Sequence, residues 1–560
     1  MVAVDTETTG LNPFNGARPF AISIYGEDRA SRYIVIGEDD LVPVDVLLNS
    51  NISEVVFHNA KFDIMMLATL GMEVNGNLHD TMIMAHVYNP DESNKGLKHL
   101  AKKYLDEDNK WQKEVDKWFH DNKINKADRN YQDVPREIME PYAVDDVRFT
   151  YGLAQFYKSK GVLEDPTYKK EMNLLKCLVN MQTRGVPIDV ELCEANSASC
   201  EKRIAEIQED INTNHKEMNV NSAKDLKEYL FDEEKIQCTN YTAKGNPSLD
   251  EYNLGQYDHP IIPKVVELRE LTKLKSTYFD GLKEECDEEG TIHCDFFQVG
   301  AKTGRFSCRK PNLQNIPRNG TLNVRSAFVC RREYSNYYFD YSQIELRIFA
   351  HYAQEPSMLA ELTKPDGDLH AMTAMNLFGE VDKEKRDIAK RLGFGIIYGI
   401  GANKFATILN QDYPDKDYNY TKASAFISKY YQSYPKISFF VGAVKRAILQ
   451  RGFVQDIFER KYTCPKDQCY KAVNYLIQGC AAGVLKKSMI EIDQFLKDKK
   501  SNLLLTIHDE LVIEIHKSEE DLVPQIKDIM EDKDTFRVPL TVNIEKTETN
   551  WSEKISLQEV

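Results

Sequence analysis

The sequence predicts an α/β and α+β multidomain protein, and three observations support that fold class. The chain has 560 residues, more than the roughly 250–300 at which a single hydrophobic core stops growing. In the first 160 residues, short β-rich runs give way to helical patterns, which is typical of α/β and α+β domains. Further along, the β-rich runs NYYFDYS and NLLLTIHDELVIEI enclose a long helical block.

The expected elements follow the spacing of apolar residues and turn formers. VAVDTETTG predicts a strand that ends in a turn, and VVFHNAKFDIMMLATLG predicts a strand that runs into a helix. We expect a strand on each side of Asp340 and on each side of Asp509, because polar residues interrupt both β-rich runs. The remaining segments are helical patterns at 78–105, 135–160 and 171–282, a polar loop or solvated helical excursion at 106–134, and a helical block at 367–450.

Composition narrows the class of protein. With 42% hydrophobic and 29% charged residues, the chain is typical of folded globular proteins. No run approaches the roughly 18 apolar residues of a membrane helix, and Asp5 and Glu7 interrupt the early apolar stretch that a secretory signal needs. The eleven cysteines are odd in number, with no histidine at zinc-ligand spacing from the closest pair, which predicts reduced thiols. We therefore expect a cytoplasmic protein without a membrane partner.

The charge distribution gives two opposing indications about nucleic acid. The net charge of −16 argues against a nucleic-acid partner. The segment 302–332, however, contains eight Lys or Arg and no Asp or Glu. Because phosphate contacts depend on local clusters of positive charge, this segment favours DNA binding; taken alone, it is better explained as a solvated basic loop.

Four carboxylates and a tyrosine form the first candidate site. Asp5 and Glu7 are two apart on a predicted strand, so both side chains leave the same face. Asp63 lies at the start of an apolar helix, and Tyr142 and Asp146 are four apart on one helix face. Such a set suits a two-metal phosphodiesterase, because hard divalent cations prefer oxygen ligands. Spacing alone leaves open whether these segments meet in space.

A second pair of carboxylates and a helical stripe form the second candidate site. Asp340 and Asp509 each lie at a predicted strand end, where the pair would hold Mg²⁺ and a triphosphate. Between them, a four-residue repeat places two cations and then two aromatic rings on one helix face. The members of this stripe are Arg386, Lys390, Phe394 and Tyr398. Cations bind phosphates and rings stack on bases, so the stripe suits a nucleotide; an amphipathic helix with snorkelling cations is the structural alternative.

The N-terminal motifs carry a family resemblance. DTET, HNAKFD and YAVDD resemble, in this order, the three motifs of the DnaQ-like (RNase H-like) proofreading exonucleases, over about residues 1–155. The resemblance implies that Tyr142 orients the attacking water and that Leu11 and Asn59 contact the primer end. The metal ligands that it implies are Asp5, Glu7, Asp63 and Asp146.

Motifs in the rest of the chain resemble those of family A, the DNA polymerase I-like enzymes. DYSQIELR, RDIAKRLGFGIIYG and IHDEL resemble motifs A, B and C, and TGRFSCRKPNLQNIP resembles the segment ahead of motif A. The resemblance implies a metal site of Asp340, Asp509 and the Tyr341 carbonyl, with Lys390 as proton donor to the leaving pyrophosphate. The residues implied for dNTP binding are Tyr341, Gln343, Glu345, His370, Arg386, Lys390, Phe394 and Tyr398. Those implied for DNA binding are Arg305, Asn474, Gln478 and His508.

These resemblances imply an RNase H-like 3′→5′ exonuclease domain joined to a right-hand polymerase of palm, fingers and thumb. The implied function is template-directed DNA synthesis from dNTPs by two-metal-ion nucleotidyl transfer, with proofreading, in DNA replication. The implied cofactor is Mg²⁺, two ions per active site with Mn²⁺ as a substitute, and the implied partners are primer-template DNA and dNTPs. The expected boundaries are 1–158 for the exonuclease domain and 159–560 for the polymerase domain, with the thumb at about 170–290, the palm at about 291–365 and 465–560, and the fingers at about 366–464.

We expect a monomer, and the sequence identifies no processivity partner. The lack of a 5′-nuclease segment ahead of the exonuclease motifs is reminiscent of bacteriophage replicative enzymes, and such a protein would act in the host cytoplasm. Four alternatives stay open. One is a polymerase with an inactive exonuclease, because the catalytic strand begins almost at Met1. Another is a single-subunit RNA polymerase, which Glu345 beside Phe394 disfavours. The last two are a nuclease whose second half only clamps DNA and a non-catalytic primer-template binding protein, both disfavoured by the clustered carboxylates.

Overall fold

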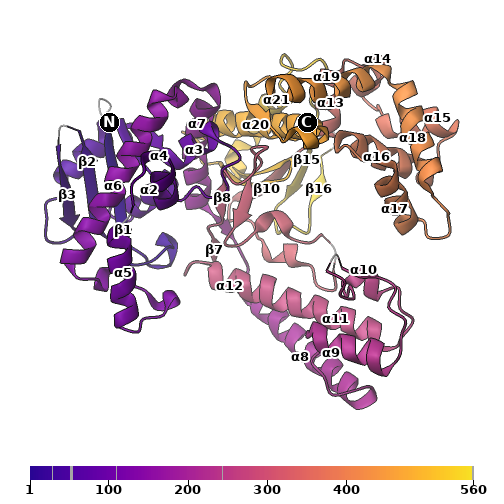
Figure 1. Ribbon diagram of the computed structural model, residues 1–560, viewed down its shortest axis with the longest axis horizontal. Helices are drawn as coiled ribbons and strands as arrows, with labels where there is room; N and C mark the ends of the chain where they lie inside the picture. The colour runs from indigo at the N-terminus through magenta and orange to yellow at the C-terminus, as the bar shows by residue number, and fades with distance from the viewer. Residues whose placement is uncertain (28, 51–53, 109, 243, 319, 558–560) are drawn as a thin grey trace.

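The computed structural model describes residues 1–27, 29–50, 54–108, 110–242, 244–318 and 320–557. Two five-stranded sheets organise these residues. Figure 1 shows the first sheet at one end of the molecule and the second near its centre, with two helical groups extending from the centre. Each sheet carries one of the two candidate sites.

The N-terminal sheet has the strand order β3-β2-β1-β4-β5. Its strands are β1 (Val2–Thr8), β2 (Pro19–Gly26), β3 (Arg29–Val35), β4 (Glu54–Phe57) and β5 (Asn77–Asp80). β1 pairs antiparallel with β2 and parallel with β4, so the sheet is mixed. β1 lies in the middle of the sheet, where its apolar residues are buried.

Helices cover this sheet and complete its core. Those of the first 160 residues are α1 (Val42–Asn49), α2 (Ala60–Ala68), α3 (Thr81–Tyr88), α4 (Leu97–Leu105), α5 (Lys110–Asp121) and α6 (Arg136–Ser159). The long α6 packs against β1, β2, β3 and β4, because one of its faces is apolar and buried along its length. α5 confirms the helical excursion expected within 106–134.

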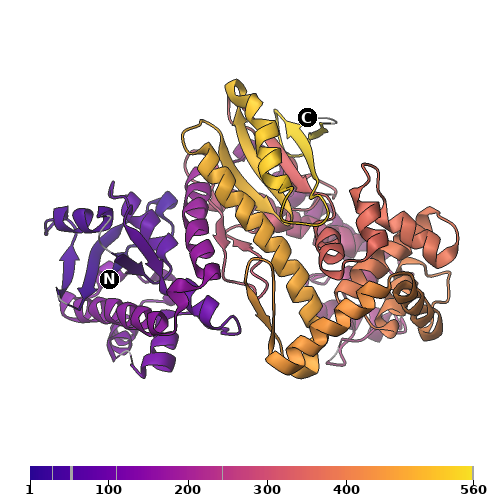
Figure 2. The same cartoon turned by 90° about the horizontal axis from the view of Figure 1, so that it is seen from above.

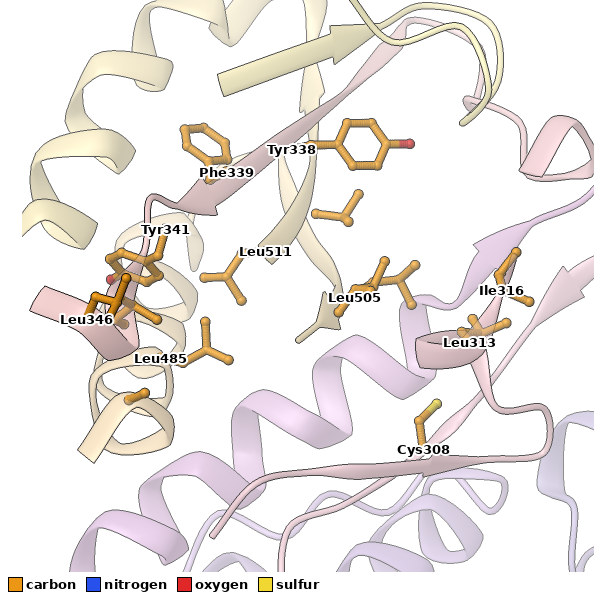
Figure 3. Close-up of a cluster of buried hydrophobic side chains, with 14 of the residues drawn as sticks. Cys308, Leu313, Ile316, Tyr338, Phe339, Tyr341, Leu346, Leu485, Leu505 and Leu511 are labelled. Atoms are coloured by element: carbon orange, nitrogen blue, oxygen red, sulfur yellow. The ribbon is translucent and has the colours of Figure 1, made fainter. Parts of the chain in front are cut away.

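The central sheet has the order β13-β14-β10-β15-β16, and all of its pairings are antiparallel. The strands are β10 (Tyr334–Tyr341), β13 (Asn502–Ile507), β14 (Glu510–His516), β15 (Val542–Thr547) and β16 (Ile555–Ser556). Helices α20 (Ala472–Leu496) and α21 (Val523–Glu531) pack beside the sheet, and α13 (Ile344–Ala353) packs on α20. Figure 3 shows their shared core, to which β10, β14, α13 and α20 contribute Tyr341, Leu511, Leu346 and Leu485.

One expected strand is wrong and the others near the second site are confirmed. β13 and β14 flank Asp509 as expected. Asp340, however, lies within β10, and α13 rather than a second strand follows it. The backbone turns at Gln343, whose φ of 52° is left-handed, and the next seven residues are all buried in the helix. Residues 344–348 alternate apolar and polar side chains, which is the period of a strand, although the two polar residues, Glu345 and Arg347, are buried and hydrogen-bonded in the helix.

The two helical groups lie on different sides of the central sheet (Figure 1). The first contains α8 (Val190–Asn214), α9 (Ala223–Lys227), α10 (Glu251–Leu254), α11 (Ile261–Lys273) and α12 (Gly281–Glu285). Within it, α8 and α11 pack along each other. The second contains α14 (Pro356–Thr363), α15 (Leu369–Phe378), α16 (Lys383–Ile397), α17 (Ala402–Asp412), α18 (Tyr420–Ser433) and α19 (Pro435–Arg451). Short two-stranded pairings join β6 (Val186–Pro187) to β7 (Thr291–Ile292), β8 (Asp295–Phe297) to β9 (Ser307–Arg309) and β11 (Phe453–Gln455) to β12 (Lys461–Thr463).

Helix α7 (Pro166–Arg184) connects the two sheets. Tyr168 and Met172 pack into the core of the N-terminal sheet, whereas Leu178 and Met181 pack into the central core. Figure 2 shows α7 between the N-terminal part and the long α20, against which it packs. A single rigid helix therefore fixes the position of one sheet relative to the other.

Two further expectations concern the whole chain. The eleven cysteines are all free thiols, as expected. Across the described residues, no helix combines the length and apolar character that membrane crossing requires.

Candidate active sites

The N-terminal sheet brings together the acidic residues of the first candidate site. Asp5 and Glu7 extend from β1, and Asp146 extends from α6, which packs on that strand. One carboxylate oxygen from each of the three lies within 4.8 Å of the others. The carboxylates expected on the strand and on the helix therefore lie together.

Asp63 joins this cluster through β1. Its Oδ1 accepts hydrogen bonds from the backbone N–H of Thr6 (3.0 Å) and from the Thr6 hydroxyl (2.7 Å). Thr6 lies between Asp5 and Glu7 in the sequence, so these bonds hold the Asp63 carboxylate, which is only 1% exposed, at the same section of the strand. All four carboxylates expected at this site are therefore together.

The cluster is electrostatically crowded. Burial, and then the charge of Asp146, raises the pKa of Glu7 to about 8. Burial likewise raises the pKa of Asp63 to about 7 and holds the pKa of Asp5 well above its usual range, with Asp63 as the next cause for Asp5. Glu7 Oε1 and Asp146 Oδ1 are buried and have no hydrogen-bond partner among the described residues. Unpartnered carboxylate oxygens at one point are the donor set that a divalent cation requires, so these residues fit a metal site.

Lys98 of α4 is a further charged residue at this cluster. Its Nζ forms an ion pair with Asp146 Oδ2, donates to the Tyr142 hydroxyl at 3.1 Å and lies 4.5 Å from the centre of the Tyr142 ring. Tyr142 is 8% exposed, and its burial raises its pKa well above the usual value. Tyr142 is thus a neutral hydroxyl beside the carboxylates. The sequence did not single out Lys98, because it lies on an amphipathic helix where a surface lysine is unremarkable.

The two residues expected at the primer end occupy different environments. Leu11 is 71% exposed in the loop after β1. Asn59 precedes α2 with a left-handed φ of 70°, and its backbone N–H donates to Asp80 Oδ1 at 3.2 Å. Asp80 also caps α3, so it fixes the two helix starts near Asn59 and Thr81 with respect to each other.

The central sheet brings together the acidic residues of the second candidate site. Asp340 on β10 is directly opposite Glu510 on β14. Asp509 occupies the turn between β13 and β14, and its backbone carbonyl accepts a hydrogen bond from the Tyr341 N–H at 3.2 Å. This bond across the strand ends fixes Asp509 beside Asp340.

These carboxylates line an open cleft of about 310 Å³. Arg318 and Arg325, from the basic segment 302–332, lie on the same cleft, together with His508. Burial, and then the charges of Glu510 and Asp509, raises the pKa of Asp340 to about 6. Paired carboxylates facing cations across a cleft of this size can hold divalent ions and phosphate groups together.

Four residues expected to contact dNTP or DNA form one hydrogen-bonded group. Glu345 of α13 is 6% exposed, forms an ion pair with Arg305 and accepts a hydrogen bond from the Tyr398 hydroxyl at 3.1 Å. Gln478 of α20 donates to the same hydroxyl at 3.4 Å. The tyrosine thereby links the end of α16 to α13 and α20.

Arg386, Lys390 and Phe394 of the predicted stripe lie on α16 as expected, and Tyr398 directly follows the last residue of this helix. Arg386 donates to Asp368 Oδ2 at 2.6 Å, and Asp368 in turn caps α15. His370 of α15 is 5% exposed, and its ring centre lies 6.0 Å from that of Phe394. Lys390 is exposed, so its ammonium group is available to a ligand. Asp368 was not predicted from the sequence, because a helix-capping residue cannot be matched to its distant cation from local sequence alone.

The remaining expected residues differ in exposure. The Tyr341 side chain is 3% exposed and bonds the Ser488 hydroxyl and the Met530 carbonyl, each at 2.8 Å. Gln343 Oε1 is buried without a hydrogen-bond partner among the described residues. His508 is exposed in the turn with a left-handed φ of 55°, and Asn474 is partly exposed near the start of α20.

Comparisons with known proteins fit this arrangement. The family described as DNA polymerase family A matches residues 190–553, and the family described as 3′-5′ exonuclease matches residues 1–161. The chain is 31% identical to a DNA polymerase I of Synechocystis sp. over 99% of its own length and 60% of the relative. It is 32% identical to a DNA polymerase I of Chloroflexus aurantiacus, over 98% of its own length and 61% of the relative. The chain thus spans about three fifths of the length of these curated relatives.

A solved structure is similar over almost the whole fold. It is the POL domain of Pol1 from M. smegmatis, in complex with a DNA primer-template and dNTP. The TM-score is 0.84 at 25% sequence identity, and the match covers 99% of this chain and 96% of that one.

Proposed function

The chain belongs to DNA polymerase family A and carries a 3′→5′ exonuclease domain, and on that premise we propose that it extends a DNA primer along a template and trims the primer end at a separate site. The observation that carries the proposal is the presence of two carboxylate clusters on two different sheets. Asp340 and Asp509 line a cleft together with Arg318, whereas Asp5, Glu7 and Asp146 meet on the N-terminal sheet.

Synthesis is assigned to the central sheet. Family A polymerase domains and 3′→5′ exonuclease domains generally use divalent metal ions. We propose two Mg²⁺ ions per site, with Mn²⁺ as a substitute. These ions would lower the pKa of the attacking hydroxyl and neutralise the leaving group. Asp340, Asp509 and the Tyr341 carbonyl would hold these ions. Arg386 and Lys390 would grip the triphosphate, and Lys390 would give a proton to the departing pyrophosphate.

The sugar and the base of the incoming dNTP are assigned to neighbouring residues. Phe394 and Glu345 would border the sugar, where Glu345 would occupy the space that a ribose 2′-hydroxyl needs. Tyr398 would stack near the template base. His370 and Gln343 would add phosphate contacts. The DNA contacts in the proposal are Arg305, Asn474, Gln478 and His508.

Trimming is assigned to the N-terminal sheet. Asp5, Glu7, Asp63 and Asp146 would hold the ions, and Tyr142 would orient the water that attacks the last phosphodiester. Leu11 and Asn59 would contact the frayed primer end. The buried, unpartnered oxygens of Glu7 and Asp146 support an active exonuclease, because an inactive one has no need for such costly groups.

The domain limits, assembly and location belong to the same proposal. We place the exonuclease domain at 1–158 and the polymerase domain at 159–560, with the thumb at about 170–290, the fingers at about 366–464 and the palm on either side of the fingers. A monomer that acts in the cytoplasm during DNA replication, on primer-template DNA and dNTPs, completes the proposal.

A gel assay of a 5′-labelled primer on a longer DNA template with Mg²⁺ tests both activities. We expect extension with the four dNTPs and shortening without them. Asp509→Ala should abolish extension and keep shortening, and Asp5→Ala should do the reverse. Asp521→Asn, which removes an exposed charge from the same part of the chain as Asp509, serves as the matched control and should leave both activities intact.

Each other outcome selects a different function. Extension without shortening would indicate a polymerase with an inactive exonuclease. Shortening alone would indicate a nuclease whose second half clamps DNA, and the loss of both activities in one folded variant would refute the assignment of two separate sites.

A further inference from the structure

Lys554 lies beside the second site in a position where three contacts hold it. It follows β15 and precedes β16, and its side chain is 15% exposed. Its Nζ lies 3.1 Å from Glu510 Oε2, 2.5 Å from Glu545 Oε2 and 4.1 Å from the centre of the Tyr338 ring. A lysine with two carboxylates and an aromatic face around it has little freedom to move.

The positive charge of Lys554 lies beside two carboxylates that repel each other at the strand ends. Asp340 and Glu510 are directly opposite in register, and like charges in that arrangement repel. Tyr338 and Asp340 are two apart on β10, so they share one face of the sheet. Lys554, which covers Tyr338, therefore lies on the face that carries Asp340. Among the described residues, Lys554 is the cation within 4.0 Å of Glu510.

We propose that Lys554 is a positioning residue of the polymerase site, which holds Glu510 toward β15 so that divalent ions are bound by Asp340 and Asp509 without a third carboxylate. This inference rests on the proposed function of the site. The number of charged ligands sets how tightly an oxygen site holds a divalent ion. A freed Glu510 would be close enough to Asp340 to join the ligand set, and the site would then bind the ion more tightly.

The same sheet offers a matched control. Lys546 on β15 lies 2.9 Å from Glu520 and 2.7 Å from Glu548, and its Nζ lies 5.6 Å from the centre of the Tyr337 ring. Its side chain is 14% exposed, almost the same fraction as that of Lys554. Tyr337 precedes Tyr338 on β10, so its ring faces the opposite side of the sheet. Lys546→Met therefore removes an equivalent pair of ion pairs away from the site.

The test measures Mn²⁺ binding to the full chain by electron paramagnetic resonance of the free ion, in an Asp5→Ala background that weakens the exonuclease site. Lys554→Met should raise the affinity of the Asp509-dependent site about tenfold, on the scale of one added carboxylate ligand. In the Glu510→Gln background, the same change should alter the affinity less than twofold. Lys546→Met should leave the affinity unchanged, and Lys554→Arg, which keeps the ion pairs, should restore the parental value.

Several results would overturn the inference. An unchanged or lowered affinity in Lys554→Met would show that Lys554 does not restrain Glu510. An equal rise in the Glu510→Gln background would assign the effect to the loss of positive charge alone. If Lys554→Met does not fold, Lys554→Gln, which keeps a hydrogen-bond donor without the charge, provides the same comparison.

A separate measurement distinguishes this inference from the proposed function. If Asp509→Ala leaves Mn²⁺ binding in the Asp5→Ala protein unchanged, the polymerase metal site itself is wrongly placed. If binding depends on Asp509 but not on Lys554, only the role of Lys554 fails.

Discussion

A buried glutamate of α7 links the N-terminal part of the molecule to the part around the central sheet, and its replacement tests how α7 packs against both cores. Glu171 of α7 is 1% exposed and accepts hydrogen bonds from Lys486 (2.6 Å), Arg460 (3.0 Å) and Gln298 (2.7 Å). Arg460 also bonds His86 Nε2 of α3 at 2.7 Å. Lys486 is 2% exposed and Arg460 9% exposed, so one carboxylate neutralises two buried cations.

Glu171→Ala should destabilise the protein strongly. Although burial raises the pKa of Glu171, Lys486 and Arg460 hold it below its usual range, so the residue is a carboxylate at neutral pH. Its loss leaves both cations buried and uncompensated, and we expect a cost of about 3–5 kcal/mol. The unfolding entropy is about 2.1 cal/mol/K per residue, and the proposed polymerase domain has roughly 400 residues, so the unfolding midpoint should fall by about 5 °C. The loss should shrink at pH 9, because burial lowers the pKa of Lys486 to about 8 and the lysine can then shed its charge.

Differential scanning calorimetry of the full chain, combined with urea unfolding, measures this effect. Glu171→Met combined with Lys486→Met should recover only part of the loss, because one buried cation is removed while Arg460 stays buried without a carboxylate. Glu164→Ala removes an exposed glutamate from the segment just before α7 and should leave the midpoint unchanged. A loss below about 1 kcal/mol in Glu171→Ala would refute the reasoning, because it would mean that water or another anion already compensates both cations.

Three further predictions concern stability, domain contact and pH. Tyr341→Phe should lower the free energy of unfolding by about 1–2 kcal/mol, because the Tyr341 hydroxyl donates to the buried Met530 carbonyl and bonds the buried Ser488 hydroxyl. Primer extension should be retained, because only the Tyr341 backbone carbonyl is assigned to the metal; a gel assay and urea unfolding of the same variant check this, and a loss of extension without a loss of stability would contradict it. Lys61→Met removes a buried lysine of α2 that pairs with Asp295. The change should speed amide hydrogen exchange in α2 and leave that of the distant α11 unchanged. Equal protection of α2 in the variant and the parent would count against a role of this ion pair in holding α2 in place. Burial, and then the Arg386 cation, lowers the pKa of His370 from 6.5 to about 4. Between these values the unfolded chain binds more protons than the folded protein, so stability should rise with pH across that window. Nuclear magnetic resonance titration of labelled histidines, with His370→Asn to assign the signal, should show no protonation of His370 above pH 6, and a midpoint near 6.5 would show that the ring is not held neutral.

The sequence predicted the composition of both candidate sites better than their geometry. The i, i+2 pair Asp5 and Glu7 and the i, i+4 pair Tyr142 and Asp146 follow directly from strand and helix repeats, and the structure places each pair on the expected type of element. The strand after Asp340 was mispredicted, because residues 344–348 alternate apolar and polar side chains as a strand does, although they form a buried helix. Lys98 and Lys554 were missed, because a lysine acquires its meaning from partners that lie 48 and 44 residues away in the chain.

The sequence by itself determined which chemical groups this protein has and on which local elements they lie, because periodicity and turn formation depend on neighbouring residues. Its motifs also determined the family to which those groups belong. Only the tertiary structure decided which distant groups meet: Asp63 reaches Thr6 across 57 residues, and Glu171 reaches Lys486 across 315. Such contacts depend on the packing of α6 and α7 against two separate cores, where the burial of many side chains at once fixes positions that no local pattern records.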